Sequence, residues 1–136
     1  MIEIIMPNLV GVLIATIVSF VIGAVWFAPQ VMGRMWMNLL GKNEEMLRKN
    51  RNKAIVFGFL ANLLTAYLLG VFVKAFFAAD WLDGAEVGFL AWLAFSFTIH
   101  FTSYIFEDRP VKLFGIDAAH QLVIFVVMGA ILGIWA

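Results

Sequence analysis

The chain has 136 residues, of which 64% are hydrophobic and only 13% charged, and its mean hydropathy is +0.99. This composition excludes an ordinary soluble domain and predicts a protein that lies in a lipid bilayer. The net charge is zero, which gives no reason to expect nucleic-acid binding. There is no cysteine, so disulfides, thiolate metal sites and cysteine nucleophiles are excluded.

Four apolar stretches reach or nearly reach the roughly 20 residues that a spanning helix needs. The predicted fold is therefore all-α, a single membrane domain over residues 1–136 that forms a bundle of four transmembrane helices. The spans are predicted at about 8–28, 54–73, 86–106 and 112–134. Because the first apolar run lacks a basic region before it and a convincing cleavage site after it, we expect it to remain in the mature protein.

The first span is expected to begin after Pro7 and Asn8, because proline suits a first helical turn and asparagine is a good cap. Small side chains recur along it every four residues, at Gly11, Ala15, Ser19 and Gly23. Such a ridge lets another helix approach closely, which predicts a helix contact.

The loop over residues 30–53 is predicted to contain two short helices. The first places its apolar side chains on one face, which favours a helix lying in the membrane interface with Trp36 among the headgroups. Asn43 can cap the second.

The second span repeats the small-residue pattern, at Ala54, Gly58, Asn62, Ala66 and Gly70. Asn62 lies near the middle of the membrane. A buried amide at that depth more often joins two helices by a hydrogen bond than it binds a ligand, but Asn62 is kept as a candidate ligand-binding residue.

The third span carries a polar stripe on one helical face. At 100° per residue, five side chains fall within roughly 80° of one another: Trp92, Ser96, His100, Ser103 and Glu107. A tight turn over residues 107–110 then leads through Pro110 into the fourth span.

The fourth span has two distinct faces. Asp117, His120 and Gln121 lie on one side, and Gly129 and Gly133 lie on nearly the opposite side. The glycine face can meet another helix of the same chain or a helix of a second copy, and both alternatives stay open.

Basic residues are strongly asymmetric. The loops after the first and third spans hold eight of the nine Lys and Arg residues, whereas the opposite side holds only Lys74. Basic loops stay in the cytoplasm, so both termini are predicted to lie outside it. The eight are Arg34, Lys42, Arg48, Lys49, Arg51, Lys53, Arg109 and Lys112.

Three motifs support a family resemblance. They read Trp26-Phe27-x-Pro29, then Gly33-x-x-Trp36-Met37, and Phe106-Glu107-x-Arg109-Pro110-x-x-Leu113-Phe114-x-Ile116-Asp117. In these motifs, over nearly its whole length, the chain resembles an uncharacterised bacterial family of small four-span membrane proteins that carries a domain-of-unknown-function label. The resemblance implies the four-helix membrane fold and the bacterial cytoplasmic (inner) membrane, and it implies no activity.

Ionisable groups at membrane depth are costly, which makes them candidates for function. The candidate ligand- or proton-binding residues are Ser96, His100, Ser103, Glu107, Arg109, Asp117, His120 and Asn62. For straight helices, His100 and His120 lie at equal depth, and Asp117 is placed to orient the imidazole of His120.

Several interpretations of this polar cluster stay open. The groups can satisfy one another and join the third and fourth spans. They can also form a proton- or ion-transport relay. His100, Asp117 and His120 offer ligands for a metal, although no metal-binding spacing supports one. A lipid-directed enzyme would use Arg109 and Lys112 to hold a phosphate and a histidine as base.

No phosphate-binding loop, pair of intramembrane acids or nucleophile elbow is present, so known catalytic motifs give no support for an enzyme, and no cofactor is indicated. The function we favour is a ligand-binding or transport protein with a cytoplasm-facing polar cleft between spans three and four. Its partners would be the bilayer, a small ligand or ion, and further copies of itself. The alternative is a non-catalytic structural or assembly protein that packs with partners through glycine-rich helix faces.

Overall fold

A computed structural model describes residues 5–136, and helices make up most of them, with no strand in that range. The elements in chain order are α1 (Leu9–Trp26), the π-helical turn η1 (Pro29–Gly33), α2 (Arg34–Leu40), α3 (Glu44–Lys49), α4 (Arg51–Ala75), α5 (Trp81–Ala91), the π-helical segment η2 (Trp92–Phe97), α6 (Thr98–Phe106) and α7 (Val111–Ile134). Because α5, η2 and α6 follow one another without a break, they form one long helix.

Four helices are long and apolar enough to cross a membrane: α1, α4, the composite helix Trp81–Phe106, and α7. The expected all-α membrane bundle is thereby confirmed, and the two short helices expected after the first span are α2 and α3. The third span begins earlier than predicted, because the Asp80 side chain accepts a hydrogen bond from the Asp83 N–H and caps the helix at Trp81. Asn8 and Asn43 cap α1 and α3 as expected.

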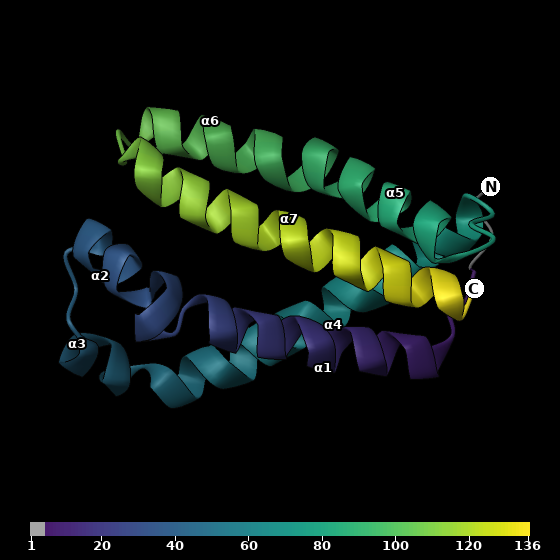
Figure 1. The fold of residues 1–136 in the computed structure, drawn as a ribbon, viewed down its shortest axis with the longest axis horizontal. Helices are drawn as coiled ribbons and strands as arrows, with labels where there is room; N and C mark the ends of the chain where they lie inside the picture. Colours follow the sequence, from purple (N-terminus) through teal and green to yellow (C-terminus); the bar gives the residue numbers. More distant parts are fainter. Residues whose placement is uncertain (1–4) are drawn as a thin grey trace.

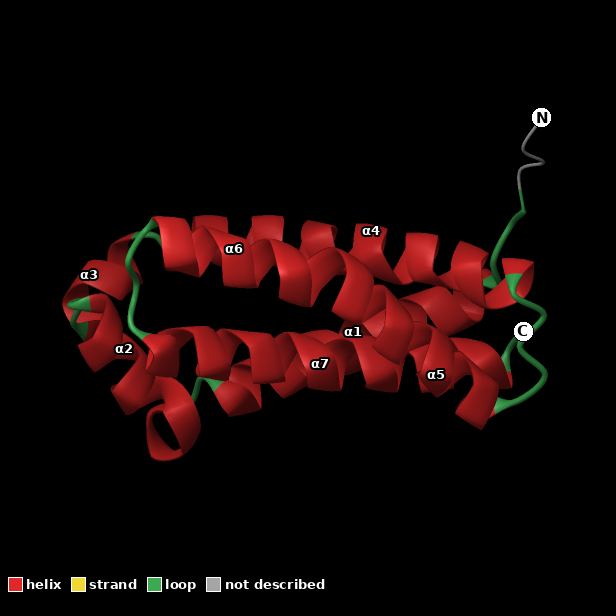
Figure 2. Ribbon diagram, turned by 90° about the horizontal axis from the view of Figure 1, so that it is seen from above, coloured by secondary structure: helices red, strands yellow, loops and turns green. Residues whose placement is uncertain are grey.

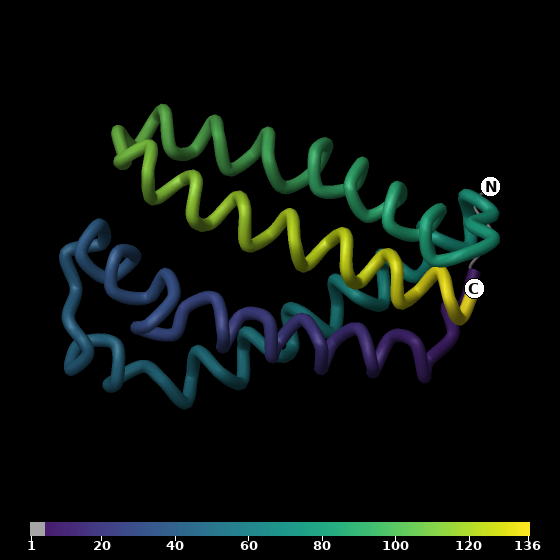
Figure 3. Tube along the Cα trace, in the orientation of Figure 1, coloured from purple at the N-terminus to yellow at the C-terminus, as the bar shows by residue number. Residues whose placement is uncertain are grey.

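The last helix, α7, lies at the centre of the bundle. It packs against α5 and α6 on one side and against α1 on the other, with α4 also in contact (Figures 1 and 3). It is accordingly the most buried of the four spans. Seen from above, α4 and α6 lie along one side of the bundle, and α1 and α7 along the other (Figure 2).

The two ends of the bundle differ in charge. The end carrying α2, α3 and the turn between α6 and α7 holds the eight basic residues named above and is called the basic end. The start of α1, the end of α7 and the connection from α4 to α5 lie at the other end (Figure 1). This acidic end carries Asp80, Asp83 and Glu86.

Glycine allows α5 and α7 to pack with their backbones in close contact. A Cβ placed on Gly84 or Gly88 would collide with the backbone of α7, and one placed on Gly129 would collide with the backbone of α5. A Cβ on Gly133 would collide with the backbone of Asp80. The glycine face of the fourth span therefore meets a helix of the same chain, through a second Gly-x-x-x-Gly pair that the sequence analysis overlooked.

The hydrophobic core occupies the half of the bundle near the acidic end. It consists of Val12, Ala15, Ala66, Leu69, Val73, Ala91, Ile124, Met128 and Leu132. Toward the basic end α4 and the α6–α7 pair move apart (Figure 1), and α6 makes its main contacts only with η2 and α7.

This uneven packing divides the two small-residue ridges. The ridge of α1 is a contact surface as expected, because Gly11, Ala15 and Ser19 are buried and Gly23 lies against His120. The ridge of α4 is a contact surface only in its second half, where Ala66 and Gly70 are buried. The expected contact at Gly58 is wrong for this bundle, because a Cβ there would meet nothing within 4 Å.

Candidate functional site

The polar stripe of the third span turns gradually away from the bundle. Trp92 and Ser96 are buried, His100 and Ser103 are half-buried, and Glu107 is exposed. Because a π-helix takes more residues per turn than an α-helix, the segment η2 shifts the register that a uniform 100° step assumes. The stripe therefore does not face one cleft along its whole length.

Within this stripe, Trp92 Nε1 donates to the carbonyl oxygen of Ala118 on α7, at 3.1 Å. Ser96 Oγ and His100 Nδ1 lie 3.4 Å apart. The first contact joins the start of the stripe to α7. The second pairs one nitrogen of His100 with a side chain of the same span.

Asp117 is held by a residue that the sequence analysis did not select. Tyr104 Oη donates a hydrogen bond to Asp117 Oδ2, joining α6 to α7. Asp117 was expected to orient His120, and the structure gives it Tyr104 as its partner. Tyr104 lies three residues, or about one helical turn, before Glu107. This proximity to the polar 107–110 turn was the only sequence signal for its role.

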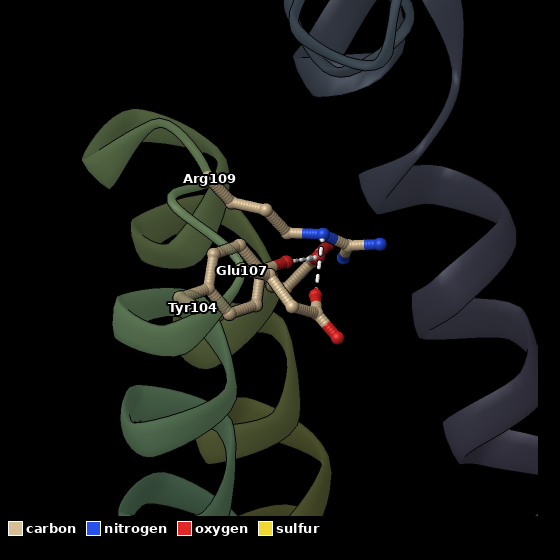
Figure 4. A network of polar contacts seen from close by, with 4 residues as sticks. Tyr104, Glu107 and Arg109 are labelled. Atoms are coloured by element: carbon tan, nitrogen blue, oxygen red, sulfur yellow. Dashed lines mark hydrogen bonds and ion pairs between the residues drawn. The ribbon is translucent and has the colours of Figure 1, made fainter.

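Arg109 closes the polar turn at the basic end. Its Nε lies 2.9 Å from Glu107 Oε2, and its guanidinium carbon lies 5.2 Å from the centre of the Tyr104 ring (Figure 4). Both charged side chains are about half exposed, so this pair contributes little to stability and mainly positions the guanidinium. Figure 4 shows that guanidinium extending from the α6–α7 turn toward the neighbouring helices.

His120 points away from the third span and toward α1. Its ring centroid lies 4.8 Å from that of Phe27 and 6.1 Å from that of Trp26. His120 Nε2 is so near the α1 backbone that a Cβ on Gly23 would lie 3.3 Å from it. His100 and His120 therefore have different neighbours, and no hydrogen bond or ring contact joins them in the described part of the chain.

Two nitrogen atoms at this interface have no hydrogen-bond partner within residues 5–136. Both His120 Nε2 and Trp26 Nε1 are fully buried and unpaired. The side chain of His120 is 91% buried, since 9% of it is exposed. Buried polar atoms are nearly always paired, so two orphaned nitrogens on adjacent rings need an explanation.

The α1 face that carries Gly23 also carries two hydroxyl groups. Thr16 Oγ1 donates to Val12 O at 2.7 Å, and Ser19 Oγ donates to Thr16 O at 2.8 Å. Both hydroxyls are almost completely buried and keep lone pairs that can accept a further bond. Ser19 was predicted only as a small contact residue, and Thr16 and Trp26 were not among the predicted site residues. The spacing of Thr16, Ser19, Gly23 and Trp26 along one helix was the available signal.

The remaining candidates lie apart from this interface. Asn62 is half-buried on α4, and its side chain forms no hydrogen bond within residues 5–136. No group of three or more His, Asp or Glu side chains in that range could hold a metal ion, so His100, Asp117 and His120 do not form a metal site.

The three sequence motifs all lie toward the basic end of the bundle (Figure 1). Trp26 and Phe27 of the first motif contact His120, and Trp36 of the second packs against Phe27, with 4.9 Å between the ring centroids and the planes inclined by 57°. Glu107, Arg109 and Asp117 of the third motif form the network around Tyr104. The first two motifs therefore contact each other, and the first also contacts α7, whereas the third forms a separate network between α6 and α7 at the same end.

The fold and these contacts define a small polytopic membrane protein, an all-α bundle of four spanning helices whose polar side chains gather toward one end. The family model described as "Protein of unknown function (DUF1761)" matches residues 10–133, and the chain belongs to this family. The expected resemblance is thereby confirmed. No curated protein and no solved structure matches the chain.

Proposed function

We propose that this protein binds a small polar ligand or a proton between α1 and α7, as part of a transport function in the bacterial cytoplasmic membrane. The observation that carries the proposal is the pair of buried, unpartnered nitrogens, Trp26 Nε1 and His120 Nε2. In a membrane interior, an unpaired polar group costs more than in a soluble protein because no bulk water can reach it.

The proposal places the site next to α1 and not between spans three and four. The contact between the third span and α7 is filled by glycine backbones at one end and by aromatic rings at the other. The ring pairs are Phe97–Phe114, Phe101–Phe114 and Tyr104–Phe114. These contacts support a structural role for that surface.

The chemistry of the two nitrogens selects the ligand. An indole N–H can only donate, whereas Nε2 of a neutral histidine can accept when Nδ1 carries the proton. A hydroxyl group or a water molecule would satisfy both, by accepting from Trp26 and donating to His120. Protonation of His120 would turn Nε2 into a second donor, and two donors favour an anion such as a carboxylate. Proton binding and anion binding would thus be coupled at this site.

The direction of access follows from charge. The eight-to-one bias of basic residues supports a cytoplasmic location for the basic end. The site lies in the half of the bundle nearer that end, outside the packed core. Access from the cytoplasm is therefore the simplest arrangement.

Ligand-dependent thermal stabilisation tests the proposal, because binding to the native state adds stability. Purified protein would be unfolded with small alcohols and small carboxylates, the carboxylates at acidic and neutral pH. We expect stabilisation in the wild type and in His100→Phe, and its loss in His120→Phe and Trp26→Phe. Equal stabilisation of all four proteins would mean that the ligand binds elsewhere. If no solute stabilised the wild type, Trp26 and His120 would have only a structural role.

One observation favours the second candidate, a non-catalytic assembly protein. The first half of α4 exposes Gly58 to open space and presents Ile55, Val56 and Phe57 outward. A helix of a partner or of a second copy could lie along this surface. A reduced oligomer size in Gly58→Leu, with unchanged ligand stabilisation, would support assembly as a separate property of this face.

A further inference from the structure

A sizeable cavity lies at the acidic end, between α4 and the start of the third span. Its volume is ≈ 620 Å³, within the range of about 300–1,000 Å³ that is typical of small-molecule sites. This cavity is at the opposite end from the basic turn and shares no residue with the site around His120.

Aromatic rings and carboxylates line this cavity together. Phe72 and Phe76 come from the end of α4, and Phe95 comes from η2. The Phe72 and Phe95 ring centroids lie 6.2 Å apart, with their planes inclined by 39°. Asp83 and Glu86 of α5 add two carboxylates to the same wall.

The carboxylates have no basic partner. Within residues 5–136 the one ion pair joins Arg109 to Glu107, at the other end of the bundle. Asp83 uses Oδ2 to accept from the Ala79 N–H at 2.9 Å, and the Glu86 side chain forms no hydrogen bond in that range. Trp81 is the first residue of α5 and is expected at the level of the lipid headgroups. Glu86 lies roughly 8 Å further along the helix axis, toward the membrane interior, where an uncompensated charge is costly.

We infer that this cavity binds a lipophilic organic cation, such as a quaternary ammonium or phosphonium compound. Ring faces attract cations within about 6 Å of their centroids, and carboxylates supply the opposite charge. The two carboxylates would repel an anionic ligand. A bare Ca²⁺ or Mg²⁺ would need about six oxygen ligands, which two carboxylates among phenylalanines do not supply. A neutral lipid chain would leave both carboxylates uncompensated.

This inference goes beyond the function proposed above and does not depend on it. The rim residues Phe72, Phe76 and Phe95 are exposed on the outer surface of the bundle, whereas Ala91 at the floor is buried. A cation with apolar substituents could therefore enter from the lipid side, with its charge beside Glu86 and its substituents against the rings.

Binding of tetraphenylphosphonium to the detergent-solubilised protein tests the inference by isothermal titration. Tetraphenylborate, which has nearly the same shape and the opposite charge, is the matched ligand control. We expect tetraphenylphosphonium to bind and Glu86→Gln to raise its Kd by about tenfold or more, because the substitution removes one of two carboxylates at nearly constant volume. Phe95→Leu should also weaken binding, since it removes a ring face.

Glu44→Gln at the basic end is the matched variant control and should bind as the wild type does. His120→Phe should do the same, which separates this site from the one proposed above. Within residues 5–136 the Glu86 side chain has no partner to lose, so Glu86→Gln should unfold at or above the wild-type temperature, and a loss of affinity would report on binding. Wild-type Kd in both Glu86→Gln and Phe95→Leu, or equal affinity for tetraphenylborate after correction for uptake by empty micelles, would overturn the inference.

Discussion

Tyr104 and Asp117 show how a carboxylate is accommodated at membrane depth. The hydroxyl of Tyr104 donates to Asp117, and the guanidinium of Arg109 lies over the face of the same tyrosine. The Tyr104 side chain therefore lies between the Asp117 carboxylate and the Arg109 guanidinium, and it contacts both. The tyrosine links α6 to α7 where neither helix has many other neighbours.

Removal of this donor should destabilise the protein. We expect Tyr104→Phe to lower the free energy of unfolding by about 1–3 kcal/mol, because a partly buried carboxylate loses its partner. The measurement is reversible unfolding in mixed detergent. Asp117→Asn should cost less, since its side-chain oxygen can still accept from Tyr104.

A double-mutant cycle supplies the control for this pair. If the hydrogen bond matters, Tyr104→Phe combined with Asp117→Leu should cost clearly less than the sum of the two single changes. Strictly additive costs would show that the two side chains do not interact in solution.

At the scale of single elements, the sequence predicted what depends on local pattern. Apolar length defined the four spans, and Asn8 and Asn43 were recognised as caps, because both signals arise from a few adjacent residues. Two features depend on contacts far apart in the chain and were missed. The pairing of Gly84 and Gly88 with Gly129 requires the facing helix to be known.

The π-helical segment η2 was the second missed feature, and it explains why the candidate site was predicted only in part. A regular helical step placed His100 and His120 at one depth on facing surfaces, but η2 changes the direction of every side chain after Trp92. Asp117 was expected to orient His120, but its partner is Tyr104. The orientation of His120 toward Trp26 could not be read from the sequence, because it depends on how α7 is rotated between its two neighbours.

The glycine contact between α5 and α7 gives a prediction at the same scale. Gly88→Ala should destabilise the bundle by about 1–3 kcal/mol, since the new methyl group would collide with the α7 backbone and force the helices apart. The measurement is again unfolding in detergent.

Gly58→Ala is the matched control, because the same substitution in α4 meets open space. It should be neutral or stabilise by up to about 1 kcal/mol through helix propensity. Equal destabilisation by both variants would mean that Gly58 also lies in a helix contact, as in an oligomer.

At the scale of the whole molecule, charge and packing are both polarised along the bundle axis. The basic end carries eight of the nine basic residues, and the acidic end carries the packed core and the glycine contacts. The two proposed sites follow this division, since the donor pair lies toward the basic end and the carboxylate-lined cavity lies at the acidic end.

The orientation of the bundle gives a prediction at this scale. We expect an alkaline phosphatase fused after Ala136 to be active in bacteria and a fluorescent protein fused there to be dark, because the basic end should stay in the cytoplasm. Fusions after Gly41, in the loop between α2 and α3, should show the reverse pattern. If the fluorescent protein fused after Ala136 were bright, the topology would be the reverse of the predicted one, and the cation cavity would lie on the cytoplasmic side.

The position of the core within the bundle also determines its leverage. Ile124, the core residue of α7 nearest the basic end, lies 13 residues after Val111, so α7 extends roughly 20 Å from the core to its first residue. A rotation of about 8° around the core would move that end by nearly 3 Å, about the diameter of a water molecule. A small rotation of the helices near the core would therefore be enough to open a path for a single water molecule at the basic end.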